Sequence, residues 1–272
     1  MAGRASPQAR PRGRHSLRSR AFAGELVRDA GVEPGSLVLD LGAGGGVLTR
    51  ALAAAGARVR AVELDPAALR QLRTRFGDDP SVEVVEADAT VVRLPDEPFA
   101  VVANLPFAAG TAILRRLLGD PQARLTQLDA IVEWGLAAKR TAVWPSTVLG
   151  CTWGAWYELT LVRRIPRACF VPPPSVDAAL LRAARRPKPL VPPEQAGAYA
   201  ALLRRAFAAQ APLDRLLPHG LVHRAALEMG FDPHGVARDL DARQWAWLYG
   251  AVRSATPHPR AAGTRRRRGS HR

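Results

Sequence analysis

The sequence has few cysteines and no long apolar run, and both absences exclude broad classes of protein. Cys151 and Cys169 are the only cysteines among 272 residues, too few for a disulfide framework or a cysteine-based zinc site. We read them as reduced core thiols of a cytoplasmic protein and expect no bound metal. No run of about 18 apolar residues occurs, so we expect no transmembrane helix and no membrane partner. The basic N-terminus lacks a following apolar segment and is unlike a secretory signal.

The positive charge lies mainly at the two ends of the chain. Twelve of the 39 Lys and Arg residues fall in residues 1–20 and 260–272, which contain no acid, so 27 basic residues face 24 acidic ones in 21–259. Basic tails on a nearly neutral body favour a polyanionic partner, most simply nucleic acid. The 47% hydrophobic content is enough for a sizeable core.

Short apolar runs alternate with helical periodicity through most of the chain. Strands are expected over 37–41, 58–62, 82–85, 99–103 and 125–132, and helices over 47–55, 66–76 and 111–118. This alternation is typical of a parallel sheet covered on both faces. Strands over 156–162 and 176–181 have no long helix pattern between them, so a hairpin is expected there.

Four segments are predicted from composition. Residues 1–20 form a basic disordered arm, 21–186 an α/β domain, 187–255 a small helical domain of three to five helices, and 256–272 an Arg-rich tail. The boundary is placed at the proline-rich stretch 186–193, because repeated prolines exclude regular structure.

A glycine-rich turn follows the first strand and opens a helix. Gly42, Gly44 and Gly46 alternate with other residues, and glycine allows a tight turn and a close approach of the backbone to a ligand. A dinucleotide site would require glycine where Val47 stands, so the loop better suits S-adenosylmethionine, which has no pyrophosphate.

Acidic residues follow the next two strands. Glu63 ends the second strand, where an acid can accept hydrogen bonds from ribose hydroxyls, and Asp88 with Ala89 follows the third, where we expect the adenine edge. The alternative is a glycine turn beside solvated acids. We favour a nucleoside site because all these features fall at the carboxyl ends of parallel strands.

Asn104, Leu105, Pro106 and Phe107 end the fourth strand and suit methyl transfer to an adenine amine. That nitrogen is a poor nucleophile because its lone pair is delocalised into the ring. The side-chain carbonyl of Asn104 and the backbone carbonyl of Leu105 can accept its hydrogens and direct the lone pair at the methyl group. Pro106 restrains the turn, and Phe107 offers a flat face on which an extruded base stacks.

Together these segments resemble the rRNA adenine-N6 methyltransferases, which include the macrolide-resistance Erm enzymes and the small-subunit adenine dimethyltransferases. The stretch Phe170–Asp177 matches a second family motif, and Ala138–Thr141 resembles a segment of the Erm branch. The resemblance covers about residues 14–255. It implies a Rossmann-like methyltransferase domain with a small C-terminal all-α domain that binds RNA.

The resemblance also implies roles for individual residues. Gly42, Glu63 and Asp88 would bind S-adenosylmethionine, Asn104 would touch both cofactor and target amine, and Phe107 and Phe170 would hold the adenine. A stretch near the family's N-terminus covers the cofactor. It corresponds to Arg14–Leu17, where Leu17 matches and His15 replaces the family's Asn.

We therefore predict a monomeric S-adenosylmethionine-dependent enzyme that mono- or dimethylates N6 of one adenosine in 23S rRNA, naked or in a pre-ribosomal particle, and confers macrolide-type resistance. Candidate phosphate contacts are Arg115, Arg116, Lys139, Arg140, Arg163, Arg164, Arg167, Arg204 and Arg205. The alternatives are 16S rRNA dimethylation, a non-catalytic ribosome-assembly factor, suggested by the altered N-terminal stretch, and a nicotinamide-dependent oxidoreductase, disfavoured by Val47.

Overall fold

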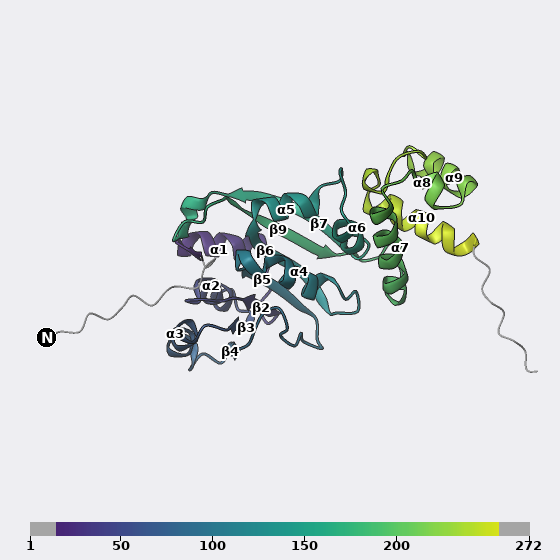
Figure 1. Ribbon diagram of the computed structural model, residues 1–272. Helices are drawn as coiled ribbons and strands as arrows, with labels where there is room; N and C mark the ends of the chain where they lie inside the picture. The colour runs from purple at the N-terminus through teal and green to yellow at the C-terminus, as the bar shows by residue number, and fades with distance from the viewer. Residues whose placement is uncertain (1–14, 256–272) are drawn as a thin grey trace, which may run out of the picture.

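The computed structural model describes residues 15–255, which form a seven-stranded mixed sheet flanked by helices, with a further group of helices at one end (Figure 1). The strand order is β4–β3–β2–β5–β6–β9–β7. The bounds are β2 Leu37–Leu41, β3 Arg58–Glu63, β4 Val82–Glu86, β5 Phe99–Asn104, β6 Leu125–Glu133, β7 Tyr157–Ile165 and β9 Ala178–Arg185. The first five strands in this order are parallel, whereas β9 is antiparallel to β6 and β7.

Helices cover both faces because the central strands are apolar on both sides. The helices along the sheet are α1 Arg20–Asp29, α2 Val47–Ala54, α3 Pro66–Phe76, α4 Gly110–Leu118, α5 Trp134–Thr141 and α6 Val148–Gly154. In β2, Leu39 and Leu41 belong to the apolar cluster of α4 to α6, whereas Val38 belongs to that of α1 and α2. Successive side chains of a strand point to opposite faces, so β2 is buried from both sides.

The predicted α/β fold is confirmed. Each expected strand and helix is found with ends shifted by up to four residues, and β7 and β9 pair as the expected antiparallel hairpin. Sequence reasoning did not identify α1, α5 and α6. Helix α1 has Arg20 and Arg28 near its two ends. By composition it therefore resembles the basic segment that precedes it.

The N-terminal prediction was wrong for residues 15–20. Ser16 and Leu17 form a short strand, β1, that pairs antiparallel with β8 (Phe170–Val171). Leu17 is buried in the cluster of α1 and α2. A buried leucine and paired backbone groups give this segment the apolar contact and hydrogen bonds that an unfolded arm lacks. The rest of the predicted arm and the Arg-rich tail lie outside the described residues.

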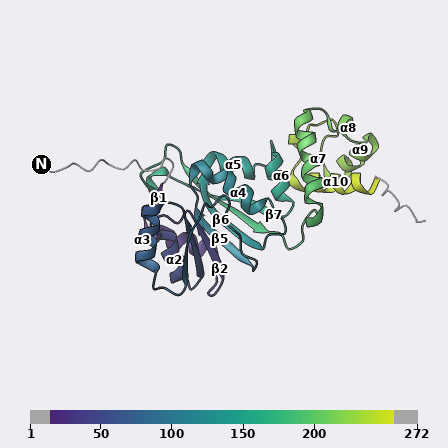
Figure 2. The same ribbon diagram turned by 60° about the horizontal axis from the view of Figure 1, so that its bottom comes forward.

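Within residues 15–255, four α-helices follow the proline-rich stretch, where three to five were expected. They are α7 Ala196–Ala209, α8 Leu213–Leu216, α9 His219–Met229 and α10 Ala242–Ala255, and Figure 2 shows them gathered beside α6. Their core continues that of the sheet. Trp156 packs edge-on against Tyr199 at 6.1 Å between ring centroids, and its indole nitrogen donates to the Val191 carbonyl at 2.8 Å. Within residues 15–255, no helix is both long and apolar enough to cross a membrane.

Gly46 gives a stability test of the packing between the glycine loop and α3. Gly46 and Gly35 both have left-handed φ angles, of 76° and 79°, but a Cβ on Gly46 would lie 2.5 Å from Phe76, whereas one on Gly35 would meet nothing within 4 Å. Both alanine variants lose roughly 1–2 kcal/mol through the backbone, and Gly46→Ala loses about 1–3 kcal/mol more through overpacking. Urea unfolding followed by circular dichroism measures both. Equal midpoints would contradict the close packing.

Candidate functional site

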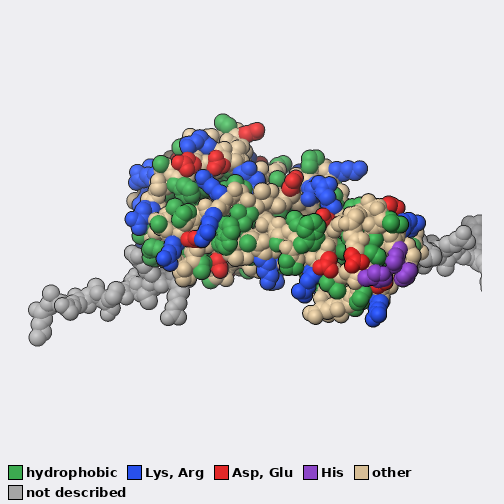
Figure 3. Space-filling view, turned by 90° about the horizontal axis from the view of Figure 1, so that it is seen from above, with side chains coloured by type: hydrophobic (Ala, Val, Ile, Leu, Met, Phe, Trp, Pro, Cys, Tyr) green, Lys and Arg blue, Asp and Glu red, His purple; other side chains and the backbone are tan. Residues whose placement is uncertain are grey.

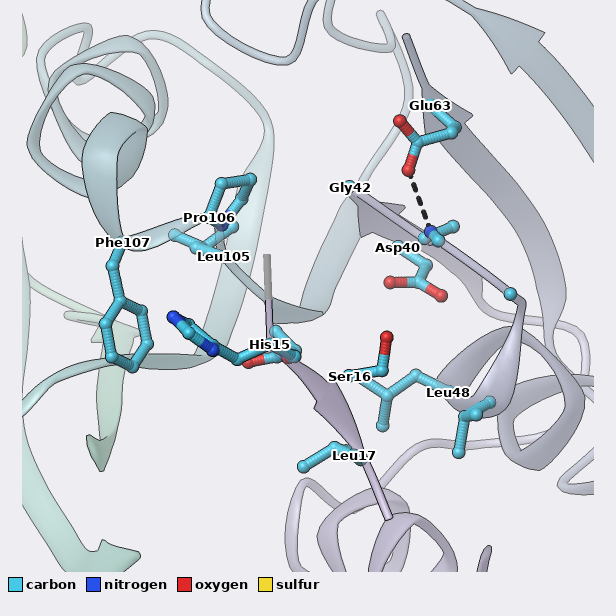
Figure 4. A pocket seen from close by; sticks show the side chains of 15 residues that line it. His15, Ser16, Leu17, Asp40, Gly42, Leu48, Glu63, Leu105, Pro106 and Phe107 are labelled. Carbon is cyan, nitrogen blue, oxygen red and sulfur yellow. Dashed lines mark hydrogen bonds between the residues drawn. The ribbon is translucent and has the colours of Figure 1, made fainter. Parts of the chain in front are cut away.

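A cavity opens at the carboxyl ends of β2, β3 and β5 (Figure 4). Its volume is about 620 Å³ when the open space at its mouth is counted. Its walls are formed by His15, Ser16, Leu17, Asp40, Gly42, Ala43, Gly44, Gly45, Val47, Leu48, Glu63, Asn104, Leu105, Pro106 and Phe107. The structure thus brings together the glycine loop, the acid that ends β3, the segment that follows β5 and the N-terminal strand.

The glycine loop forms the floor of the cavity, where Gly42, Gly44 and Gly45 contribute no side chain and Ala43 contributes only a methyl group. Gly42, Gly44 and Gly46 all have left-handed φ angles, of 73°, 55° and 76°, which side chains disfavour. A Cβ on Gly42 would lie 3.2 Å from the ring of Pro106, so glycine also lets the loop approach the segment after β5. The amide of Gly42 donates to the Val62 carbonyl at 2.8 Å and therefore holds the loop against β3.

Glu63 lies beside the glycine loop and is 2% exposed. One carboxylate oxygen accepts the Gly44 amide at 2.9 Å, the bond drawn in Figure 4. The other accepts the amides of Leu64 and Asp65 at 2.7 and 2.8 Å. Backbone donors on two loops thus fix the carboxylate at the end of β3, where its oxygens form an acceptor surface of the cavity.

Asp40 is a second buried acid in the cavity, which sequence reasoning missed. It lies in β2, is 1% exposed, and accepts the Thr49 hydroxyl at 2.7 Å. Burial raises the pKa of Asp40 to about 7, the hydrogen bonds with Thr49 oppose the rise, and the nearby charge of Glu63 adds to it. The sequence pattern that could have identified Asp40 is an acid two residues before Gly42, in a strand whose other residues are Leu and Val.

The N-terminal strand closes one side of the cavity through Asn104. The side-chain amide nitrogen of Asn104 donates to the backbone carbonyl of His15 at 2.6 Å. The His15 ring donates from Nδ1 to the Pro172 carbonyl at 2.8 Å and lies 5.4 Å from the ring of Phe107. The side-chain oxygen of Asn104 is buried and has no hydrogen-bond partner among residues 15–255. An unsatisfied acceptor therefore stands at the cavity wall.

The residues after Asn104 are held by the sheet and by the glycine loop. Leu105 is buried, and its amide donates to the Ile131 carbonyl at 3.0 Å. Pro106 lies over Gly42, and Phe107 begins the short 3₁₀ turn Phe107–Ala109 at the cavity mouth. The backbone of this segment is therefore fixed while the half-buried Phe107 ring stays accessible from the cavity.

Asp88 and Ala89 do not line this cavity. The exposed carboxylate of Asp88 accepts the amide and the hydroxyl of Thr90, both at 2.8 Å. These bonds lower its pKa. The acid thus caps its own turn after the edge strand β4, and its expected contact with the adenine edge stays a prediction.

Phe170, the other residue expected to hold the adenine, does not line this cavity, and its contact with the base stays a prediction. Its ring is fully buried in the cluster that contains Leu17. It meets Phe107 edge-on, with 6.4 Å between ring centroids. Its place in β8, which pairs with β1, makes it a support behind Phe107 and the N-terminal strand.

Several expected phosphate contacts are engaged within the protein instead. Arg163 pairs with Asp29 at 3.3 Å, and Arg164 pairs with Asp177. Arg140 is half-buried over the ring of Trp153, and burial lowers its pKa. Arg164 is exposed despite its ion pair, and the other exposed candidates are Arg115, Lys139, Arg167, Arg204 and Arg205.

Comparisons with known proteins agree with this geometry. A family model described as ribosomal RNA adenine dimethylase matches residues 10–245. The chain is 39% identical to the mycinamicin-resistance protein MyrB of Micromonospora griseorubida over 244 residues, which are 88% of this chain and 76% of that protein. It is 32% identical to the ribosomal RNA small subunit methyltransferase A of Synechococcus sp. (strain JA-3-3Ab) over 260 residues, 90% of this chain and 93% of that one.

A solved structure extends the similarity to three dimensions. The crystal structure of the 23S rRNA methyltransferase ErmE superposes with a TM-score of 0.76 at 29% identity, covering 87% of this chain and 99% of that one. The likeness therefore includes the C-terminal helices as well as the sheet.

Asp40 predicts a pH dependence of stability. Because its pKa in the folded protein is about 7 rather than 3.8, the folded state holds a proton that the unfolded state releases between these values. This contribution to stability is therefore present at low pH and is lost as pH rises towards 7. Asp40→Asn removes the dependence, which is on the order of 3–4 kcal/mol for a shift of this size.

Urea unfolding at pH 5 and pH 8 measures the part of this difference that falls between the two pH values, about 2–3 kcal/mol. Asp78→Asn, which changes an exposed carboxyl away from the cavity, is the matched control. Wild type and Asp40→Asn losing the same stability between the two pH values would refute the raised pKa.

Proposed function

The chain belongs to the ribosomal RNA adenine dimethylase family, and from this premise we propose that it methylates N6 of one adenosine in 23S rRNA and thereby confers macrolide-type resistance. That it is an rRNA adenine N6-methyltransferase using S-adenosylmethionine follows from the family and from the methyltransferases related to it. Membership also rules out the nicotinamide-dependent alternative. The target RNA and the roles of individual residues are the proposal.

The cavity fits S-adenosylmethionine in charge and shape. The ligand carries a positive sulfonium and an ammonium group, and the wall contains two buried acids, Asp40 and Glu63. The glycine floor leaves room for a flat group close to the backbone. We assign the ribose hydroxyls to Glu63, which holds its acceptor oxygens at the end of β3, and the covering of the ligand to His15 and Leu17. Bound there, S-adenosylmethionine supplies an electrophilic methyl group.

The buried oxygen of Asn104 carries the proposal for chemistry. An acceptor that lacks a partner inside the protein is unfavourable by about 1–3 kcal/mol, and an adenine amine provides the missing donor. Asn104 accepts one amine hydrogen and the Leu105 carbonyl the other. Both carbonyls then orient the nitrogen lone pair towards the methyl group. Because no strong base is required before attack, these residues act by positioning and electrostatics.

Phe107 is the proposed stacking surface for the extruded adenine. It lies beside Asn104 at the cavity mouth, and Phe170 and His15 hold its ring in place. Base–aromatic stacking contributes roughly 1–3 kcal/mol. Phe107 therefore helps offset the loss of stacking when the base leaves the RNA.

The choice of 23S rather than 16S rRNA as the proposed target rests on the names of the similar proteins. The 39% identical relative is named a mycinamicin-resistance protein, and the similar solved structure is named a 23S rRNA methyltransferase. The small-subunit enzyme is 32% identical and covers a similar share of the chain, so 16S rRNA is the second candidate. The non-catalytic alternative is disfavoured because His15, Ser16 and Leu17 line the cavity although His15 replaces the family's Asn.

We assign RNA binding to the helical segment 187–255 and to the two basic tails. Arg204 and Arg205 are exposed on α7, and they present positive charge on the helical side of the proposed boundary after residue 186. The Arg residues of 1–14 and 256–272 add charge at both ends of the chain. Such contacts hold phosphates without reading bases, so binding weakens steeply with salt.

Transfer of a labelled methyl group to purified rRNA tests the target. The full chain is incubated with radiolabelled S-adenosylmethionine and either 23S or 16S rRNA, and the modified base is mapped. We expect label at one adenosine of 23S rRNA because the relative named for mycinamicin resistance is 39% identical and the solved 23S rRNA methyltransferase is 29% identical. Label in 16S rRNA alone would replace the proposed target with the second candidate.

Asn104→Ala tests the chemistry independently of the target. Removing the amine acceptor should lower methyl transfer at saturating cofactor by about 100-fold or more, the loss typical of a transition-state hydrogen bond. Cofactor affinity falls less, because Asp40 and Glu63 remain. The exposed residue Arg93 provides a control, Arg93→Ala, with unchanged transfer. Near-normal transfer by Asn104→Ala would disprove the proposed role.

A further inference from the structure

Three of the chain's six histidines gather in the C-terminal helices, far along the chain from the cavity. His219 and His223 lie in α9, and His234 lies in the loop after it. Figure 3 shows histidine side chains as one patch on this end of the molecule. Asp214 of α8 lies beside them, paired with His234 at 2.8 Å. The methyltransferase site uses none of these residues.

The spacing of the residues places their ligand atoms together. His219 and His223 are four residues apart in one helix, so both rings lie on the same face, with 4.1 Å between ring centroids. Three possible ligand atoms, one each from Asp214, His219 and His223, lie within 4.8 Å of one another. Two helical histidines at this spacing with a carboxylate are a donor set that suits zinc.

Two of these groups contain buried atoms without a hydrogen-bond partner. Nε2 of His223 and Oδ1 of Asp214 are both buried, and neither has a partner among residues 15–255. The Asp214 side chain is only 11% exposed. Leaving such atoms unsatisfied is unfavourable, whereas a cation at the centre of the cluster satisfies both.

We propose that Asp214, His219 and His223 form a zinc site. Oδ1 of Asp214 and one ring nitrogen of each histidine are the ligands, and water completes the tetrahedron on the exposed side of His219. His234 is a positioning residue. Its Nδ1 binds the other oxygen of Asp214 and directs Oδ1 towards the metal, as outer partners of zinc ligands do.

The site joins α8 to α9 in the part of the chain assigned to RNA binding. Its ligands come from two short elements separated by a turn, so the metal fixes one against the other. The expectation of no metal considered cysteine ligands only, whereas these ligands are histidines and a carboxylate. The inference is independent of the rRNA target, because it concerns only these four side chains.

Equilibrium dialysis of the full chain with ZnCl₂ tests the site. The protein, without a histidine tag and treated with a chelator, should take up a single Zn²⁺ per chain, and Mg²⁺ should not compete because imidazole favours zinc. His219 is exposed, so His219→Ala leaves the core intact and should weaken zinc binding by about 100-fold or more. His234→Ala, which removes only the outer partner, should weaken it about 10- to 100-fold.

Glu228→Gln is the matched control, because it removes an exposed carboxylate of α9 outside the cluster and should leave zinc uptake unchanged. Circular dichroism of each variant confirms that α9 is folded. A rise in Tm on adding zinc, present in wild type and Glu228→Gln but absent in His219→Ala, supports the site. Equal zinc affinity of wild type and His219→Ala, or no zinc uptake by the wild type, would overturn it.

Discussion

The hydrogen bond from the Asn104 amide to the His15 carbonyl determines how the proposed catalytic segment faces the cavity. An amide side chain has a donor end and an acceptor end, and the 2.6 Å bond to His15 occupies the donor end. The oxygen must therefore point elsewhere, and it lies buried without a partner. The orientation of the proposed catalytic acceptor thus depends on the N-terminal strand.

That strand is in turn held by residues far away in the chain. β1 pairs with β8, and Leu17 and Phe170 share one apolar cluster. The end of α1 is anchored by Gln127, which donates to the Ala30 carbonyl at 2.9 Å, and by Arg182, which contacts both Asp29 and the buried Asp129. The proposed cofactor cover, which the sequence predicts to be disordered, is therefore held in place by β8 and by the cluster of α1 and α2.

The sheet and the cavity floor were predictable because their signals are local. Local sequence is enough to predict the apolar strand β2, the glycine turn after it and the start of α3 at Pro66. Each of these features depends only on residues close by in the chain. The role of Phe170 was not predictable, because burial behind Phe107 depends on the pairing of β8 with β1. The contact that Asp88 makes was not predictable either. Its carboxylate accepts the backbone amide of Thr90, two residues further on, which its position at a strand end does not reveal.

The aromatic contacts between the sheet and the C-terminal helices have a mechanical consequence. Trp156, Tyr199 and Tyr249 form a continuous edge-to-face series, and the cluster around them includes Trp245 of α10 and Leu181 of β9. A hinge across such a core would expose these rings to water. The C-terminal helices are therefore held at a fixed distance from the cavity. If these helices hold RNA as proposed, the RNA has to adapt its shape to the protein. Only an adenosine whose distance along the RNA from the bound phosphates matches the distance from the helices to the cavity then reaches Asn104.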